Sequence, residues 1–257
     1  MNDGEDLAPA EPTQLLAPLR ERGFQVEFIN HARAILQVDF PSALDDIEAV
    51  ILGLTFSVES LVRSGGGEHD LTQVLRRSFA ARHWTKHNFE ITKHVDGVAR
   101  ESISHEIDHV KAFPKAGVVA MEIEWNNKDP FYDRDLENFK RLHAEAAISV
   151  GVIVTRGLSL QNNMRRRIRK FAENRNITSY VSLEAFDLAP TVRQKGLVDG
   201  KVSRGTSFAT AWSEVFTSDK FGEATTHWRK LEARVHRGVG NPCPLLLIGI
   251  PEEVMTD

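Results

Sequence analysis

The chain has 257 residues, of which 41% are hydrophobic, and a formal net charge of -4. These values are typical of a folded globular protein and argue against one that coats nucleic acid nonspecifically through a basic surface. The single cysteine, Cys243, excludes an internal disulfide and a thiolate metal cluster. The sequence has no apolar run of about 18 residues and does not begin with a basic and then apolar leader, so we expect a cytoplasmic protein that is neither exported nor inserted into a membrane.

The first half of the chain predicts helices and strands in alternation. Periodicity of 3.6 residues favours a helix interrupted once over residues 42–63 and an amphipathic helix over 68–84. Period-two alternation predicts strands over 24–29, 88–95 and 104–113. The last two strands flank an Asp-Gly turn, so we expect them to pair as a hairpin.

The second half predicts a strand covered by helices and a basic segment. A strand over 118–125 is followed by a helix with Asp133 or Asp135 as its cap, and then by a short strand over 148–155 that is apolar on both faces. Three more helices are expected, one capped by Ser159 and two within 206–217 and 225–236, before a last strand over 244–250. The polar, glycine-containing stretch 193–205 reads as a loop. Together these elements indicate an α/β core whose sheet has an antiparallel part.

Two glutamates interrupt the apolar run "VVAMEIEW" at residues 118–125. Side chains alternate across a strand, so Glu122 and Glu124 share one face at a spacing of about 7 Å. Burying a lone carboxylate is costly unless a cation or a hydrogen-bonding partner compensates. The alternative is that both are solvated or paired with basic residues nearby in the sequence, namely Lys128, Arg134 and Lys140.

A third carboxylate on the preceding strand favours a metal site. A hairpin-like arrangement would bring Asp108 beside Glu122, with Glu106 two residues away on the same face. Several oxygen donors that meet at a strand end suit a hard cation such as Mg²⁺, which binds a few carboxylates, waters and a substrate phosphate.

Basic residues late in the chain are candidates for DNA contact. Side chains that read or grip DNA are most often basic or polar, and a helix N-terminus with hydroxyl groups binds phosphate. The candidates in the expected loop are Arg193, Lys195, Lys201 and Arg204, and those at the start of the last helix are Thr225, Thr226, His227 and Lys230. A solvated surface is the alternative for both groups.

Three stretches of this sequence resemble a known family. The runs "SHEIDHVK", "VAMEIEWNNKDPFYDRDLENFKRLH" and "ISVGVIVTRG" are similar to the BglII group of type II restriction endonucleases, a branch of the PD-(D/E)XK nuclease superfamily related to BamHI. The similarity is densest over residues 84–157. It implies an α/β restriction-endonuclease core with a central mixed sheet flanked by helices. Residues 1–257 would form a single endonuclease domain, with 1–20 flexible and 190–237 an elaboration for DNA recognition.

The resemblance also implies roles for the carboxylates. Asp108 and Glu122 match the acids that ligate the metal, and the backbone carbonyl of Ile123 would be a further ligand. Glu124 occupies the position of the superfamily's lysine, where the BamHI branch has glutamate and the BglII branch has glutamine. Glu124 would therefore either polarise the attacking water or add a metal ligand.

Two assignments within this resemblance have alternatives. The spacing between Asp108 and Glu122 is longer than in the short hairpins of the family, so Glu106 is the fallback for Asp108. A fourth active-site residue is expected upstream, and Glu90 is preferred to Glu59 and Glu68.

The function that the resemblance implies is Mg²⁺-dependent, sequence-specific hydrolysis of double-stranded DNA that leaves 5′-phosphate ends. A homodimer is expected because a palindromic site matches a two-fold axis. A separate DNA methyltransferase would protect the same sequence. The alternatives are a PD-(D/E)XK nuclease of DNA repair and a DNA-binding module without catalysis.

Overall fold

The computed structural model describes residues 15–63 and 70–257. Most of the segment expected to be flexible, residues 1–14, lies outside this part of the chain, as does Glu68. Within the described part, a short helix, α1 (Ala17–Glu21), precedes the first strand.

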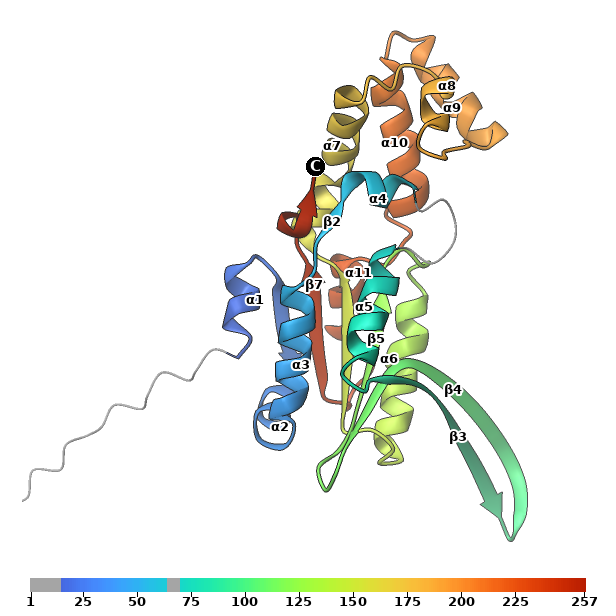
Figure 1. Cartoon of the computed structure of the whole chain (residues 1–257). Coiled ribbons are helices and arrows are strands. Elements are labelled where there is room, and N and C mark those ends of the chain that lie inside the picture. Colours follow the sequence, from blue (N-terminus) through green and yellow to red (C-terminus); the bar gives the residue numbers. More distant parts are fainter. Residues whose placement is uncertain (1–14, 64–69) are drawn as a thin grey trace, which may run out of the picture.

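A mixed sheet of six strands forms the centre of the molecule, in the order β1-β7-β6-β5-β4-β3 (Figure 1). Strands β5, β6 and β7 are parallel to one another, whereas β1, β4 and β3 pair antiparallel with their neighbours. The strands are β1 (Gln25–Ile29), β3 (Thr85–Val95), β4 (Val98–Phe113), β5 (Gly117–Glu124), β6 (Val150–Arg156) and β7 (Leu245–Ile250). A two-residue parallel pair, β2 (Phe56–Ser57) and β8 (Met255–Thr256), lies apart from this sheet. The expected α/β fold with a mixed central sheet flanked by helices is thus confirmed.

Helices cover both faces of the sheet because β5, β6 and β7 are apolar on both sides. Alternate residues of β5 enter two cores, Val119 and Met121 on one face and Ala120 on the other. The first face packs against α2 (Ala32–Asp39), α3 (Pro41–Leu52), α4 (Val58–Arg63), α5 (Asp70–Ala80) and α7 (Leu158–Asn174). The second face packs against α6 (Phe131–Ala144) and α11 (Trp228–Val235). Because side chains alternate along β5, Glu122 and Glu124 lie on the same face as Ala120 and therefore point toward α6.

One end of the molecule is helical. There, α7 extends beyond the sheet and packs against α10 (Phe208–Phe221), which in turn packs against α9 (Val192–Val202). The short helix α8 (Tyr180–Glu184) lies at the same end of the molecule (Figure 1). A short turn of 3₁₀ helix, η1 (Glu252–Val254), follows β7. None of the helices in the described ranges is long and apolar enough to cross a membrane.

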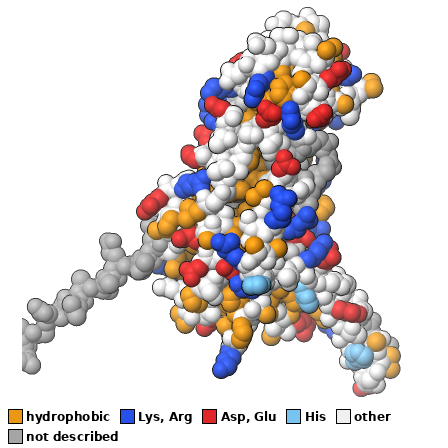
Figure 2. Space-filling model, in the orientation of Figure 1, with side chains coloured by type: hydrophobic (Ala, Val, Ile, Leu, Met, Phe, Trp, Pro, Cys, Tyr) orange, Lys and Arg blue, Asp and Glu red, His pale blue; other side chains and the backbone are white. Residues whose placement is uncertain are grey.

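The hairpin of β3 and β4 projects from the body of the molecule (Figures 1 and 2). Asp96 and Gly97 form its turn with positive φ angles of 52° and 79°, as expected for the Asp-Gly pair. Most β3 side chains are exposed. The base of this hairpin carries Asp108.

Three local predictions were wrong. The stretch 193–205 is not a loop: Thr191 caps α9, its side chain accepting a hydrogen bond from the backbone N–H of Gln194. Neither Asp133 nor Asp135 caps α6, because Pro130 occupies the N-cap position. Ser159 lies inside α7, which is preceded by Gly157.

Candidate active site

The register of β4 and β5 places Asp108 next to Glu122. His109 pairs with Met121 in this antiparallel ladder, so Asp108 and Glu122 occupy the next position along the two strands. The residues "KAFPKAG" between them extend both strands and form the turn. The pairing of β4 with β5 is continuous from this turn to His109 and Met121, so the longer spacing does not move Asp108 away from Glu122. The predicted neighbourhood of Asp108 and Glu122 is therefore present in the structure.

A fourth carboxylate meets these strands from α6. Asp135 is 1% exposed and lies against Glu124, which is 3% exposed, and Glu122, which is 6% exposed. Sequence reasoning had considered Asp135 only as a helix cap. A signal was present, because Asp135 follows Tyr132 by three residues and precedes Phe139 by four, which puts it on the buried face of α6.

Three of these four acids line one polar pocket of about 640 Å³ between the middle of β4, the end of β5 and α6, and Asp135 is not part of its lining. Asp108, Glu122, Ile123 and Glu124 all contribute to its wall. The remaining lining residues are mainly polar or charged: Ser104, His105, Glu106, Asn127, Asp133, Arg134, Glu137, Asn138 and Arg141.

Burial and mutual repulsion make Glu122, Glu124 and Asp135 hard to ionise. Burial, followed by the charge of Asp135, raises the pKa of Glu124 to about 8. Burial also raises the pKa of Glu122 well above its usual range, with further contributions from Asp135, Asp108 and Glu124. The pKa of Asp135 is raised by burial as well.

Arg134 supplies only part of the compensating charge. Its guanidinium lies 2.8 Å from Oδ1 of Asp135 and 3.8 Å from Oε1 of Glu124, and its side chain is 54% exposed. Oδ2 of Asp135 is buried with no hydrogen-bond partner among the described residues. When ionised, Glu122, Glu124 and Asp135 would therefore carry more negative charge than Arg134 alone neutralises.

Asp108 is more accessible than Glu122 and Glu124. Its side chain is 56% exposed, and Nζ of Lys86 on β3 lies 3.6 Å from its carboxylate. The same lysine makes a shorter contact of 2.7 Å with Glu106. Glu106 therefore serves as the ion-pair partner of Lys86, and Asp108 remains the acid aligned with Glu122.

Glu90 lies away from this group. It is exposed on β3, opposite Ser104, and its carboxylate accepts a hydrogen bond from Ser102 in the projecting hairpin. Glu90 does not line the pocket. The alternative Glu59 of α4 is paired with Arg63 of the same helix and with Arg175 directly after α7, also outside the pocket.

A buried arginine holds the loop that follows β5. Arg156, at the end of β6, donates hydrogen bonds to Oγ1 of Thr225 at 2.6 Å and to the carbonyl of Thr226 at 2.5 Å. The backbone N–H of Thr226 donates to the carbonyl of Asn127 at 2.9 Å, and Nδ2 of Asn127 donates to Oε2 of Glu124 at 2.9 Å. This chain of contacts fixes one oxygen of Glu124. The sequence reasoning did not identify Arg156 or Asn127.

The phosphate contacts predicted for Thr225, Thr226 and His227 do not fit their positions. All three are buried, at 5%, 0% and 0% exposure. The backbone N–H groups of Thr225 and Thr226 already donate to Gly222 and Asn127. Burial and the charge of Arg156 lower the pKa of His227 to about 4, so its imidazole is neutral. Thr225 and Thr226 anchor Arg156 in the interior.

The basic residues predicted for DNA contact have different surroundings. Arg193 borders a polar pocket of about 360 Å³ together with Lys128 and Lys220, and it lies 3.5 Å from Asp219. Lys230 is 3.5 Å from Asp129. The other predicted residues are Lys195, which lies over the ring of Tyr180, Lys201, which is paired with Glu214 at 2.9 Å, and Arg204, which is exposed after α9.

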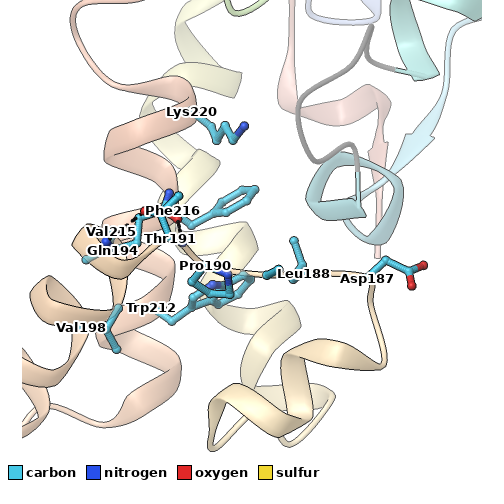
Figure 3. Close-up of a pocket in the computed structure, with 11 residues that line it drawn as sticks. Asp187, Leu188, Pro190, Thr191, Gln194, Val198, Trp212, Val215, Phe216 and Lys220 are labelled. Carbon is cyan, nitrogen blue, oxygen red and sulfur yellow. Dashed lines mark hydrogen bonds between the residues drawn. The ribbon is translucent and has the colours of Figure 1, made fainter.

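Packing against α10 gives the basic stretch its helical structure. Trp212 and Phe216 of α10 line a pocket of about 220 Å³ together with Leu188, Pro190 and Val198 (Figure 3). Val198 is the buried residue of α9, and the Gln194 amide donates a hydrogen bond to Asp219 of α10. The pocket is thus part of the contact between the two helices.

The donors in the larger polar pocket fit a hard divalent cation. Mg²⁺ is usually bound through one or two carboxylates, with waters and substrate phosphates completing the shell. Glu122 and Glu124, the carboxylates of raised pKa that line the pocket, provide oxygen ligands whose charge Arg134 compensates only in part. The acids of this pocket do not bring three potential ligand atoms within 4.8 Å of one another, so there is room between them for these other ligands. Among the described residues, the three side chains that meet this distance are Glu27, Glu232 and His236, which lie elsewhere.

Comparison with known proteins assigns the family. A search of curated proteins finds no match. The family model of the restriction endonucleases BglII/BglIII matches residues 24–250. The match spans the whole sheet, from β1 to β7, and includes the pocket with its carboxylates. The chain therefore belongs to the BglII/BglIII restriction endonuclease family, whose members are site-specific endonucleases.

Proposed function

We propose that this chain is a type II restriction endonuclease that hydrolyses phosphodiester bonds in double-stranded DNA at a specific sequence, requires Mg²⁺ and leaves 5′-phosphate ends. The observation that carries the proposal is the convergence of Asp108, Glu122 and Glu124 on one polar pocket in a chain of this family.

Asp108 and Glu122 would hold the Mg²⁺, with the backbone carbonyl of Ile123 as a further ligand. When bound, the ion would lower the pKa of a water ligand and neutralise charge that develops on the scissile phosphate. Glu124 would accept the proton of the attacking water. Asn127 orients the Glu124 carboxylate by donating a hydrogen bond to its Oε2, and the other oxygen, Oε1, faces Arg134. Asp135, whose side chain faces Glu124, keeps the affinity of Glu124 for a proton high.

The surface around the pocket supplies DNA contacts in this proposal. Lys128 follows Glu124 by four residues, is exposed and shares a polar pocket with Arg193 and Lys220. We assign phosphate contact first to these three side chains. Further contacts are proposed for Lys195, Lys201, Arg204 and Lys230.

The proposed assembly is a homodimer that binds a palindromic site about a two-fold axis, because each strand then meets an equivalent pocket. A separate DNA methyltransferase would modify the same sequence in the host. Both proposals rest on the assignment as a type II enzyme.

Cleavage of a fully sequenced plasmid tests the proposed function. The purified chain with Mg²⁺ should give discrete fragments with 5′-phosphate ends, and EDTA should abolish cleavage. Asp108→Ala and Glu122→Ala should lose cleavage by about a thousandfold or more and retain DNA binding. Glu173→Gln, an exposed change on α7, is the matched control. A preference for flaps or mismatches would instead indicate a repair nuclease, and binding without Mg²⁺-dependent cleavage would indicate a DNA-binding module.

A further inference from the structure

We propose that Glu27, Glu232 and His236 form a second metal site, one for a transition ion of the Zn²⁺ class, separate from the carboxylate pocket. One potential ligand atom from each of the three side chains lies within 4.8 Å of the other two. The site joins the edge strand β1 to α11, and none of the three residues lines the pocket that holds Glu122. The inference does not depend on the proposed function.

The backbone holds these three residues in fixed relative positions. Glu232 is on α11 and His236 directly follows its last residue, so the four-residue spacing puts both on one side of the helix. Glu27 is in the middle of β1, where it pairs with Leu247 of β7. The indole of Trp228, buried one turn earlier in α11, donates a hydrogen bond to Glu232 at 3.3 Å. A ligand set on a paired strand and a packed helix is more preorganised than one on loops.

The two carboxylates of the cluster have no lysine or arginine among the described residues to compensate their charge. Two carboxylates this close repel each other, and in the described ranges no lysine or arginine forms an ion pair with either Glu27 or Glu232. The basic group that pairs with Glu27 is the imidazole of His236, whose Nε2 lies 3.5 Å from its carboxylate. By contrast, Glu214 is paired with both Lys201 and Arg165. The C-terminal end of α11 adds further negative potential at this point.

The donor set selects the class of metal. One imidazole nitrogen and two carboxylate oxygens are typical ligands of Zn²⁺, and a solvent molecule completes four-coordination. A hard ion such as Mg²⁺ favours oxygen ligands only. His236 is exposed and both glutamates are partly exposed, so the ion can enter from solvent. A bound ion would link β1 near the start of the chain to α11 near its end.

The experiment uses the full chain with Glu122→Ala, so that binding in the catalytic pocket is weakened in every sample. Isothermal titration with Zn²⁺ should show binding that is reduced at least tenfold in affinity, or lost, when His236→Ala or Glu232→Gln is added. The matched control is His94→Ala, an exposed histidine on the projecting hairpin, which should bind Zn²⁺ as the parent does. Mg²⁺ at the same concentration should not compete. Equal Zn²⁺ affinity with and without His236 would overturn the proposal.

A second measurement keeps the test independent of folding in the variants. In the chain with an intact cluster, NMR of the histidine ring protons should show the His236 signal shifting on addition of one equivalent of Zn²⁺, while that of His94 stays in place. The His236 signal is assigned from the spectrum of His236→Gln. An unmoved His236 signal at saturating Zn²⁺ contradicts the site even if His236→Ala unfolds.

Discussion

At the scale of the residue, the buried carboxylates around Glu124 are tolerated in the absence of a metal because some of them keep a proton. Burial raises the pKa of Glu124 to about 8, and Asp135, which faces Glu124, has a buried oxygen without a donor. A proton on Glu124 can satisfy that oxygen. A divalent cation would satisfy the same group of oxygens with greater charge.

This arrangement predicts that the metal-free protein becomes less stable as the pH rises. Between the ordinary glutamate value of 4.5 and about 8, the folded state binds more protons than the unfolded state at Glu124. The free energy of unfolding therefore falls with rising pH across this window. Glu124→Gln should remove much of the fall and raise the free energy of unfolding at pH 8 by on the order of 2 kcal/mol. Urea unfolding at pH 5 and pH 8 in EDTA measures both effects.

The exposed change Glu173→Gln provides the comparison for that measurement and should leave the pH dependence as it is. Added Mg²⁺ should stabilise the unmodified chain most at pH 8, where the acids are most ionised. If the unmodified chain is equally stable at pH 5 and pH 8 in EDTA, the proposed protonation of Glu124 is wrong.

At the scale of the element, the active-site strand is held by segments that are distant in the sequence. Arg156 of β6 fixes the residues before α11, and these fix the loop after β5 through Thr226 and Asn127. On the other side, Tyr132 of α6 shares a 2.6 Å hydrogen bond with Thr155, which donates to the carbonyl of Glu124. Glu124 is thus oriented by groups on β6, on α6 and in the segment before α11.

Removing the last link of this chain tests its role in positioning. Asn127→Ala should slow cleavage by about tenfold, the effect of losing one hydrogen bond to a charged group. Burial raises the pKa of Glu124, and the hydrogen bond from Asn127 lowers it in part. Removing Asn127 should therefore raise this pKa further and move the acidic limb of the plot of cleavage rate against pH to higher pH. Single-turnover rates from pH 6 to pH 9 measure both. Asn126→Ala, an exposed neighbour, should leave the profile in place.

The same contacts mark where sequence reasoning succeeded and where it did not. The six strands of the main sheet were predictable because alternation, short apolar runs and the Asp-Gly turn are local signals, and the pairing of Asp108 with Glu122 followed from them. The short strands β2 and β8 were not predicted. The spacing of Asp135 from Tyr132 and Phe139 indicates that it lies on the buried face of α6, but its place beside Glu124, like the role of Arg156, depends on which buried groups the fold brings together. The helix α9 was missed because its glycines and charges are typical of a loop, while its packing on α10 stabilises it.

At the scale of the whole molecule, the net charge of -4 requires that DNA be bound through a local surface. On the face shown in Figure 2, basic and acidic side chains are interspersed over the body. Many of the arginines and lysines are already paired, as Lys201 is with Glu214 and Arg166 is with Glu252. Such pairs offer less net charge to a phosphate. Lys128, which forms no ion pair among the described residues, is therefore a better candidate. Arg193 shares its pocket beside the active-site loop, and although Asp219 lies 3.5 Å away, the Arg193 side chain is 75% exposed and remains open to a phosphate.

The salt dependence of DNA binding distinguishes these contacts from the rest of the surface. Lys128→Ala and Arg193→Ala should each weaken binding of the cleavage-deficient Glu122→Ala chain and reduce the slope of log K against log salt by about 1. Lys115→Ala removes the same charge from the turn between β4 and β5, at the opposite end of β5 from Glu124, and should leave the slope unchanged. Fluorescence anisotropy with a labelled duplex between 50 and 200 mM salt, roughly the range over which phosphate contacts dominate affinity, measures the slope. Equal slopes for all three variants would place the DNA on another surface, because counterion release depends only on which charges meet the phosphates.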